Sequence, residues 1–228
     1  MTPSSPKSRT AAGLPPITAA KVAAAATALT ARKGLDGWSV RDLAGELDVY
    51  PAVIYHHIGG RDAVLHAVTE RVVAQMPCPP ADLPWRDWFT EFLCEGRKVL
   101  RKYPGVARRL YLAGPTVPSA MRIIDRGVTV LQRAGFGDEA VDIYSYLVGT
   151  GFLHVDLEDE RAERVEERLA ARDAFLAHGN REDTPGLAAM ASQLSTRGRT
   201  PAQIVKDDEQ AFRYIIDLCL DGAETHLG

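Results

Sequence analysis

The chain has 228 residues, of which 46% are hydrophobic and 25% charged, and its formal net charge is −3. This length is enough for one large domain, or for a small domain beside a larger one, with a buried core. The composition favours a soluble globular protein over an intrinsically disordered chain. No apolar run approaches the roughly 18 residues of a membrane helix, so the sequence also excludes a membrane span.

Residues 1–16 are rich in Ser, Pro and Thr, carry Lys7 and Arg9, and have no signal-peptide pattern. We expect a disordered basic arm there. The chain has an odd number of cysteines, widely spaced and without any Cys-x-x-Cys pair: Cys78, Cys94 and Cys219. Reduced structural thiols are therefore expected rather than a disulfide or a zinc site, which predicts a cytoplasmic protein.

Residues 17–33 form the first predicted helix, which begins at the N-cap Thr18 and ends at Gly34. A second helix is predicted to follow Ser39, because Ser39 and Asp42 have the spacing of a capping box. Its apolar residues recur at helical spacing and should share one buried face: Val40, Leu43, Ala44 and Leu47.

A third short helix is predicted after a tight turn in which Asp48 tolerates a left-handed conformation, since Pro51 suits the first helical position. Ile54 and Ile58 share its buried face. The remaining positions are left largely outward and include two imidazoles: Pro51, Ala52, Val53, Tyr55, His56 and His57. This spacing predicts a helix-turn-helix domain over residues 17–62.

A fourth helix from Arg61 to about Met76 has an apolar stripe and is stopped by the run Pro77-Cys78-Pro79-Pro80. We expect residues 63–80 to be a connecting helix with a Pro-rich link, and residues 81–228 to be a separate helical domain. The first 63 residues carry seven Lys/Arg against five Asp/Glu, so a slightly basic head precedes an acidic body.

No part of the body alternates with the period of a strand, so the predicted fold class is all-α. The expected helices cover residues 84–102, 104–113, 117–134, 138–157 and 201–226. The charged segment Glu158 to His178 has only a thin apolar stripe and should lie half in solvent. Residues Gly179 to Arg199, rich in Gly, Ser, Thr and charge, are expected to be the least ordered part of the body.

This order of parts resembles the tetracycline-repressor (TetR) family of transcriptional regulators. The resemblance is carried by residues 34–44, 47–49 and 54–58 together with Arg61, and it is specific over residues 17–68. It implies a three-helix DNA-binding head and an all-helical body that binds an effector and dimerises. The sequence departs from the family pattern at Asp48, where Gly is usual, and at Pro51-Ala52-Val53, where Gln-Pro-Thr is common.

The resemblance implies DNA contacts from the second and third helices, against the alternative of a plain solvated surface. Arg41 is the long cation placed to reach a guanine edge, Ala52 and Val53 could read only methyl groups, and His57 or Arg61 would hold phosphate. The predicted DNA-binding residues are Arg41, Tyr50, Pro51, Ala52, Val53, Tyr55, His56, His57 and Arg61.

In the body, aromatic side chains are either core or the wall of a small-molecule cavity, and the sequence leaves both readings open. The candidate pocket residues are Trp88, Phe89, Phe92, Tyr111, Tyr144, Phe152 and His154. Such a pocket would take a mainly apolar or aromatic effector. The apolar helix of residues 138–157 and the last helix are expected to pair with a second copy in a homodimer.

Phosphate-binding loops, dinucleotide turns, metalloprotease motifs and nucleophile elbows are absent from the sequence, so no catalytic residue or cofactor is predicted. Adjacent His56 and His57 diverge on a helix, and His154 with Glu158 fits a polar rim, so no metal site is predicted. The sequence predicts a repressor that a small effector releases from a palindromic operator. A helix-turn-helix protein that acts through a protein partner is the alternative, and a helical enzyme a remote one.

Overall fold

The computed structural model describes residues 16–227, and all regular structure in that range is helical. This confirms the predicted all-α fold class. Apart from Pro16, the basic arm expected over residues 1–16 lies outside the described residues. None of the helices in the described range is both long and apolar enough to cross a membrane.

Three short helices form the head: α1 (Ala19–Lys33), α2 (Val40–Glu46) and α3 (Pro51–Ile58). Their buried faces meet around Val22, Leu43 and Ile54, none of which is measurably exposed. Trp38, in the link before α2, is also buried, and its indole N–H donates to the Thr30 hydroxyl at 3.0 Å. Because this buried donor is satisfied, the link is fixed against α1.

Helix α4 (Arg61–Val73) leaves the head and packs against α1 at one end and α7 at the other. Its buried residues, Val64, Leu65, Val68 and Val72, are those of the predicted stripe. The helix ends at Val73, and irregular turns carry the chain on to the buried Met76. One continuous helix therefore runs from the recognition elements into the body.

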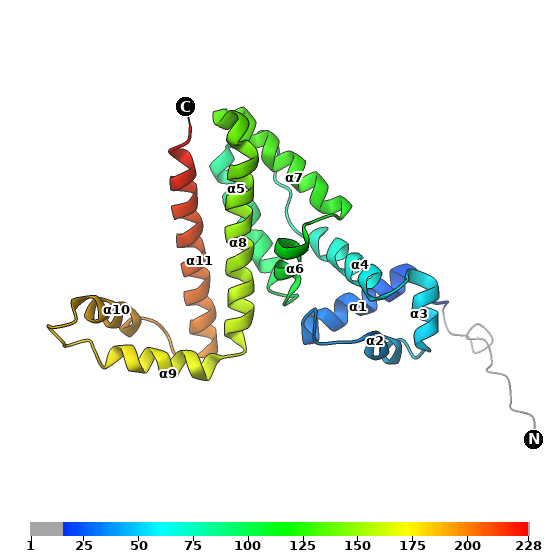
Figure 1. Ribbon diagram of the computed structural model, residues 1–228, viewed down its shortest axis with the longest axis horizontal. Helices are drawn as coiled ribbons and strands as arrows, with labels where there is room; N and C mark the ends of the chain where they lie inside the picture. The colour runs from blue at the N-terminus through cyan, green and yellow to red at the C-terminus, as the bar shows by residue number, and fades with distance from the viewer. Residues whose placement is uncertain (1–15, 228) are drawn as a thin grey trace, which may run out of the picture.

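The body contains five helices around one core: α5 (Trp85–Leu100), α6 (Val106–Ala113), α7 (Pro118–Leu131), α8 (Ala140–Ala162) and α11 (Pro201–Glu224). Figure 1 shows α8 and α11 standing side by side as the two longest rods, with the head on one side of them. A pair of helices, α9 (Val165–Leu176) and α10 (Pro185–Ser195), projects on the other side.

One expectation about the body was wrong in detail. Helix α8 does not end near Leu157 but continues to Ala162, because Glu158 and Asp159 are buried and paired with Arg97 of α5 and with Arg101 directly after it. The stretch from Gly179 to Arg199 contains α10, which packs on α9, between turns. Helix α9 buries none of its residues, in agreement with the expected half-solvated segment.

Candidate nucleic-acid interface and ligand cavity

The turn between α2 and α3 has the local geometry that the sequence indicates. The Ser39 hydroxyl accepts from the Asp42 amide at 3.2 Å, and the Asp42 carboxylate accepts from the Ser39 amide at 2.7 Å, so both halves of the capping box form. Asp48 is left-handed with φ of 50°, and Pro51 occupies the first turn of α3. The buried Ile54 then packs α3 against the rest of the head.

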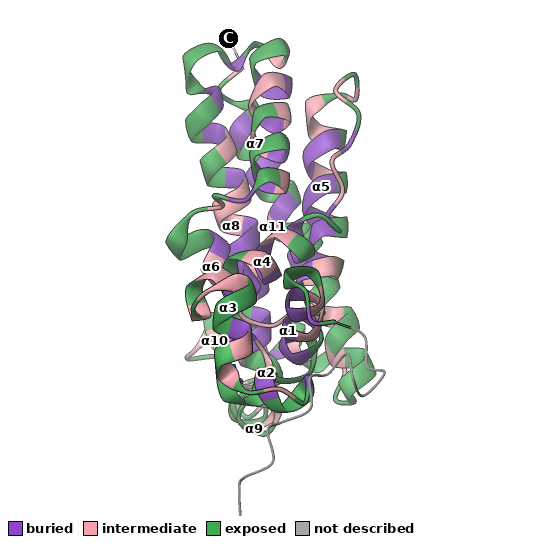
Figure 2. Ribbon diagram, turned by 90° about the vertical axis from the view of Figure 1, so that its right-hand side faces the viewer, coloured by how far each residue is buried: buried purple, intermediate pink, exposed green. Residues whose placement is uncertain are grey.

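The outer surface of α3 carries aromatic and imidazole side chains into solvent. Tyr50 is 77% exposed and Tyr55 54%, and His56 and His57 are exposed beside them. Figure 2, which views the head from the front, shows α3 mostly exposed or intermediate. Of the predicted DNA-binding residues on α3, Ala52, Tyr55, His56 and His57 are exposed, whereas Pro51 is partly buried and Val53 packs against the core.

Arg41 and Arg61 have different environments. Arg41 lies exposed on α2, and no ion pair ties it down among the described residues. The Arg61 guanidinium stacks over the Trp38 ring at 5.0 Å and donates to the carbonyls of Trp38 and Leu35. Arg41 is free to reach a ligand, whereas Arg61 fastens α4 to the link before α2.

A cavity of about 400 Å³ opens in the body between α4, α6, α7 and α8. Four of the seven predicted pocket residues line it: Phe92, Tyr111, Tyr144 and Phe152. The wall is almost entirely apolar. An enclosure of this size and character is typical of small-molecule sites.

The other three candidates lie elsewhere. Trp88 and Phe89 are fully buried in the core behind the cavity, where the Trp88 indole donates to the Pro79 carbonyl at 3.1 Å. His154 lines a separate groove together with the charged residues Arg108, Asp156 and Glu160. Burial, reinforced by Arg161, lowers the pKa of the His154 imidazole, so this ring is uncharged at neutral pH.

Most aliphatic residues of the cavity wall were missing from the sequence-based set. The largest group comes from α4 and its extension and from α7: Val73, Met76, Ala120, Ile123, Ile124 and Val128. Ile124 and Val128 belong to the apolar face of residues 117–134 that the helical period identifies. The helical period of the apolar residues shows which face of a helix points inward. It does not distinguish inward residues that pack on a neighbouring helix from inward residues that line a cavity.

Head and body also meet at a second junction, away from α4. The Leu35 amide, in the link after α1, donates to the Pro104 carbonyl at 2.8 Å. The next amide, that of Gly105, donates to the Asp159 carboxylate at 3.1 Å. Gly105 has φ of 84°, and an added Cβ would stand 3.2 Å from the Leu35 Cβ. This close approach needs a residue without a side chain.

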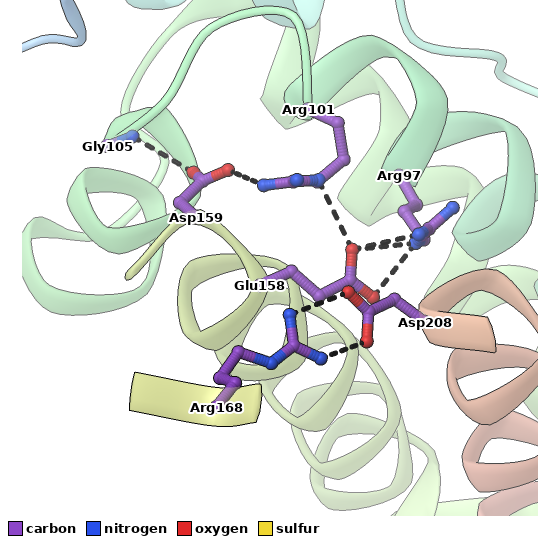
Figure 3. A network of polar contacts seen from close by, with 7 residues as sticks. All are labelled: Arg97, Arg101, Gly105, Glu158, Asp159, Arg168 and Asp208. Carbon is purple, nitrogen blue, oxygen red and sulfur yellow. Dashed lines mark hydrogen bonds and ion pairs between the residues drawn. The ribbon is translucent and has the colours of Figure 1, made fainter. Parts of the chain in front are cut away.

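Asp159 belongs to a buried polar network that ties α8 to the C-terminal end of α5, and beside it Arg168 of α9 pairs with Asp208 of α11 (Figure 3). Arg101 pairs with Asp159, and Arg97 forms a forked pair with Glu158 at 2.9–3.0 Å. Burial raises the pKa of the Glu158 carboxyl, and the Arg97 guanidinium acts against that shift. The network fixes the end of α8 that holds the second junction.

A helix-turn-helix head joined by one helix to an all-helical body with an apolar cavity defines a one-component transcriptional regulator. The family model described as "Bacterial regulatory proteins, tetR family" matches residues 22–68, and the model described as "Tetracyclin repressor-like, C-terminal domain" matches residues 76–227. The chain belongs to the TetR family of bacterial regulatory proteins. This confirms the predicted class, a DNA-binding regulator and not an enzyme.

Curated relatives include an HTH-type transcriptional regulator of Saccharopolyspora erythraea, 28% identical over 76% of this chain and 75% of that protein. The HTH-type transcriptional repressor DrrR1 of Streptomyces coeruleorubidus is 28% identical over 92% of this chain and 78% of its own. Among solved structures, the TetR family protein ActR of Streptomyces coelicolor in complex with actinorhodin has a TM-score of 0.79 at 22% identity, covering 94% of this chain and 99% of its own. BioQ with its double-stranded DNA operator has a TM-score of 0.60 at 21% identity, covering 80% of this chain and 100% of its own. At these identities the two structures show a shared fold.

Proposed function

We propose that this protein is a dimeric, cytoplasmic repressor that binds a palindromic DNA operator and is released from it by a small, mainly apolar effector. One observation carries the proposal: Val73 and Met76, at the body end of the connecting helix α4, form part of the cavity wall. A ligand in the cavity therefore touches the element that is covalently continuous with the head.

Helix α6 supplies a second path between ligand and head. Its C-terminal half gives Leu110, Tyr111 and Gly114 to the cavity wall, while Gly105, at its N-terminus, packs against Leu35 of the head. A ligand that fits only one arrangement of α4 and α6 shifts the population toward that arrangement, and one with equal affinity for both arrangements shifts nothing. The effector must therefore bind best when the two heads do not match the operator.

An unpartnered apolar face on the two longest helices supports the dimer. Tyr146 and Leu153 on α8 are 49% and 44% exposed, and Tyr214 and Leu218 on α11 are 64% and 51% exposed. Each pair lies at helical spacing on one side of its helix. Exposed apolar area of this extent marks an interaction surface, and a second copy would cover it as a four-helix bundle.

The experiment that tests the proposal is selection of bound sequences from random DNA, followed by titration of uncharged aromatic compounds against the selected complex. We expect a palindrome and at least one compound that releases the protein from it.

Tyr111→Ala should shift the compound concentration that releases half of the protein by about tenfold, a change of about 1.4 kcal/mol, because Tyr111 lines the cavity. Ligand-free operator affinity should stay within about threefold. Tyr111 is 47% exposed, so its removal leaves the core intact. DNA binding without salt dependence, or none at all, would favour the alternative of a regulator that acts through a protein partner.

Arg41→Ala should weaken operator binding by about 1–3 kcal/mol and relax the preference at one base pair, because a guanine edge would lose its donor. Anisotropy titrations with the operator, its single-base variants and random DNA measure both effects. Lys33→Ala, an exposed cation at the end of α1, is the comparison. If Lys33 contacts a phosphate, its removal should weaken binding to all DNA sequences alike. Equal losses on operator and random DNA for Arg41→Ala would contradict a reading role.

A further inference from the structure

The cavity wall has no charged side chain among the described residues. The polar side chains that line it, within residues 16–227, are Tyr111, Tyr144 and Ser145. The Ser145 hydroxyl is already used, because it donates to the Val141 carbonyl at 2.8 Å. An ionised ligand group that binds against this wall would lose its hydration and gain no counter-charge. Its transfer into the cavity is therefore strongly unfavourable.

Tyr144 is the inner of the two tyrosines. It is half-buried, whereas Tyr111 is 47% exposed at the rim. Within residues 16–227, the Tyr144 hydroxyl has no hydrogen-bond partner. Burial raises its pKa well above the ordinary value, so it stays protonated and can donate. A ligand oxygen in the cavity would be an acceptor for this hydroxyl.

The position of the Tyr144 ring depends on Gly127 of α7. A Cβ built on Gly127 would stand 2.6 Å and 2.9 Å from two carbons of that ring and 3.1 Å from the Trp88 indole. Trp88 cannot yield, because it is fully buried, bonded to Pro79 and packed against Phe89 at 4.8 Å. Tyr144 borders open space, so any side chain at residue 127 would push its ring into the cavity.

Taking the proposed effector response as the starting point, we propose that this cavity selects uncharged aromatic ligands with a carbonyl-type acceptor bound by the Tyr144 hydroxyl. Gly127 acts as the size-determining position, because it lets the Tyr144 ring lie back against α7. Gly127 is a positioning residue, since it acts through Tyr144 and not on the ligand itself.

The probe for the test is propionyl-dimethylaminonaphthalene, an uncharged aromatic ketone whose emission responds to hydrogen bonding at its carbonyl. It is titrated into the full-length protein without DNA. Saturable binding is expected, while the anionic dye anilinonaphthalene sulfonate should bind at least about tenfold more weakly. Tyr144→Phe should weaken the ketone about three- to tenfold and shift its bound emission to the blue, because one hydrogen bond is lost.

Gly127→Ala should weaken the ketone at least about tenfold in the natural background and have a clearly smaller effect beside Tyr144→Ala, because the displaced ring is then absent and only the 3.1 Å contact with Trp88 remains. Gly186→Ala is the control. It also adds one methyl group to a helical glycine, but Gly186 lies exposed on α10, outside the cavity wall, where the new Cβ meets nothing within 4 Å, so affinity should change less than about threefold. Circular dichroism checks that each variant folds.

Three results would overturn the inference: equal binding of the anionic dye, unchanged emission and affinity in Tyr144→Phe, or an equal effect of Gly127→Ala in both backgrounds. The comparison of Tyr144→Phe with the unaltered protein tests the inference even if Gly127→Ala does not fold. Because all readings are taken without DNA, a protein that binds the ketone but never leaves its operator would contradict the proposed repressor mechanism and leave the ligand class intact.

Discussion

Leu218→Glu should convert the protein into a monomer and reduce operator affinity at least about a hundredfold, because one recognition helix alone reads a single half-site. Leu218 is 51% exposed on α11, next to Tyr214 on the same side of the helix. A two-fold axis through this face would place two new carboxylates against an apolar surface, without a counter-charge. Sedimentation at micromolar concentration and operator titration measure the two effects.

Leu112→Glu is the matched control for that experiment. Leu112 is 71% exposed on α6, outside the apolar face of α8 and α11, so this variant should remain dimeric and bind DNA normally. The proposed interface would be wrong if Leu218→Glu sediments as the unaltered protein does, or if both variants dissociate alike.

Arg97→Met should destabilise the folded protein by about 3 kcal/mol, because the buried Glu158 carboxylate loses its forked partner and keeps only the 3.3 Å contact with Arg101. Both side chains are only 7% exposed, and Arg97 also lies over the Phe212 ring at 5.5 Å. Urea unfolding at one fixed protein concentration measures the loss, since dimer stability depends on concentration. Most of it should return in the double variant Arg97→Met, Glu158→Met, which also removes the buried carboxylate that Arg97→Met leaves with Arg101 alone.

Arg108→Met provides the comparison for a solvated pair. Arg108 bonds to Asp156 and Glu160, but its side chain is 43% exposed, and this substitution should cost less than about 1 kcal/mol. A loss of that small size in Arg97→Met as well would show that water reaches the network and that burial does not set its strength.

The head could be predicted closely because its signals are local. The capping box at Ser39 and Asp42, the turn at Asp48 and the helix start at Pro51 each depend on residues within one turn of each other. What the sequence did not indicate is the latch of Arg61 on Trp38, since those two residues meet only after α4 folds back on the link.

The body was predictable in its helices but less so in its cavity and its charges. Trp88 and Phe92 are both aromatic residues of α5, yet only Phe92 faces the empty space, and which one does depends on how α7 crosses α5. The charged stretch after Leu157 suggested a solvated segment, whereas Arg97 and Arg101, some 60 residues earlier, pair with it and keep α8 helical. Pairing across such separations leaves no periodic pattern in the sequence.

The hydrogen bond from the Leu35 amide to the Pro104 carbonyl has a mechanical consequence. A rigid domain attached at one point can tilt in any direction. A rigid domain attached at two separate points can rotate only about the line that joins them. The head is held by α4 and by this bond, so while both persist its swing follows a single arc. In the proposed two-fold dimer, the two heads would swing along arcs related by the two-fold axis. This motion would change the spacing of the two α3 helices, which a DNA duplex fixes.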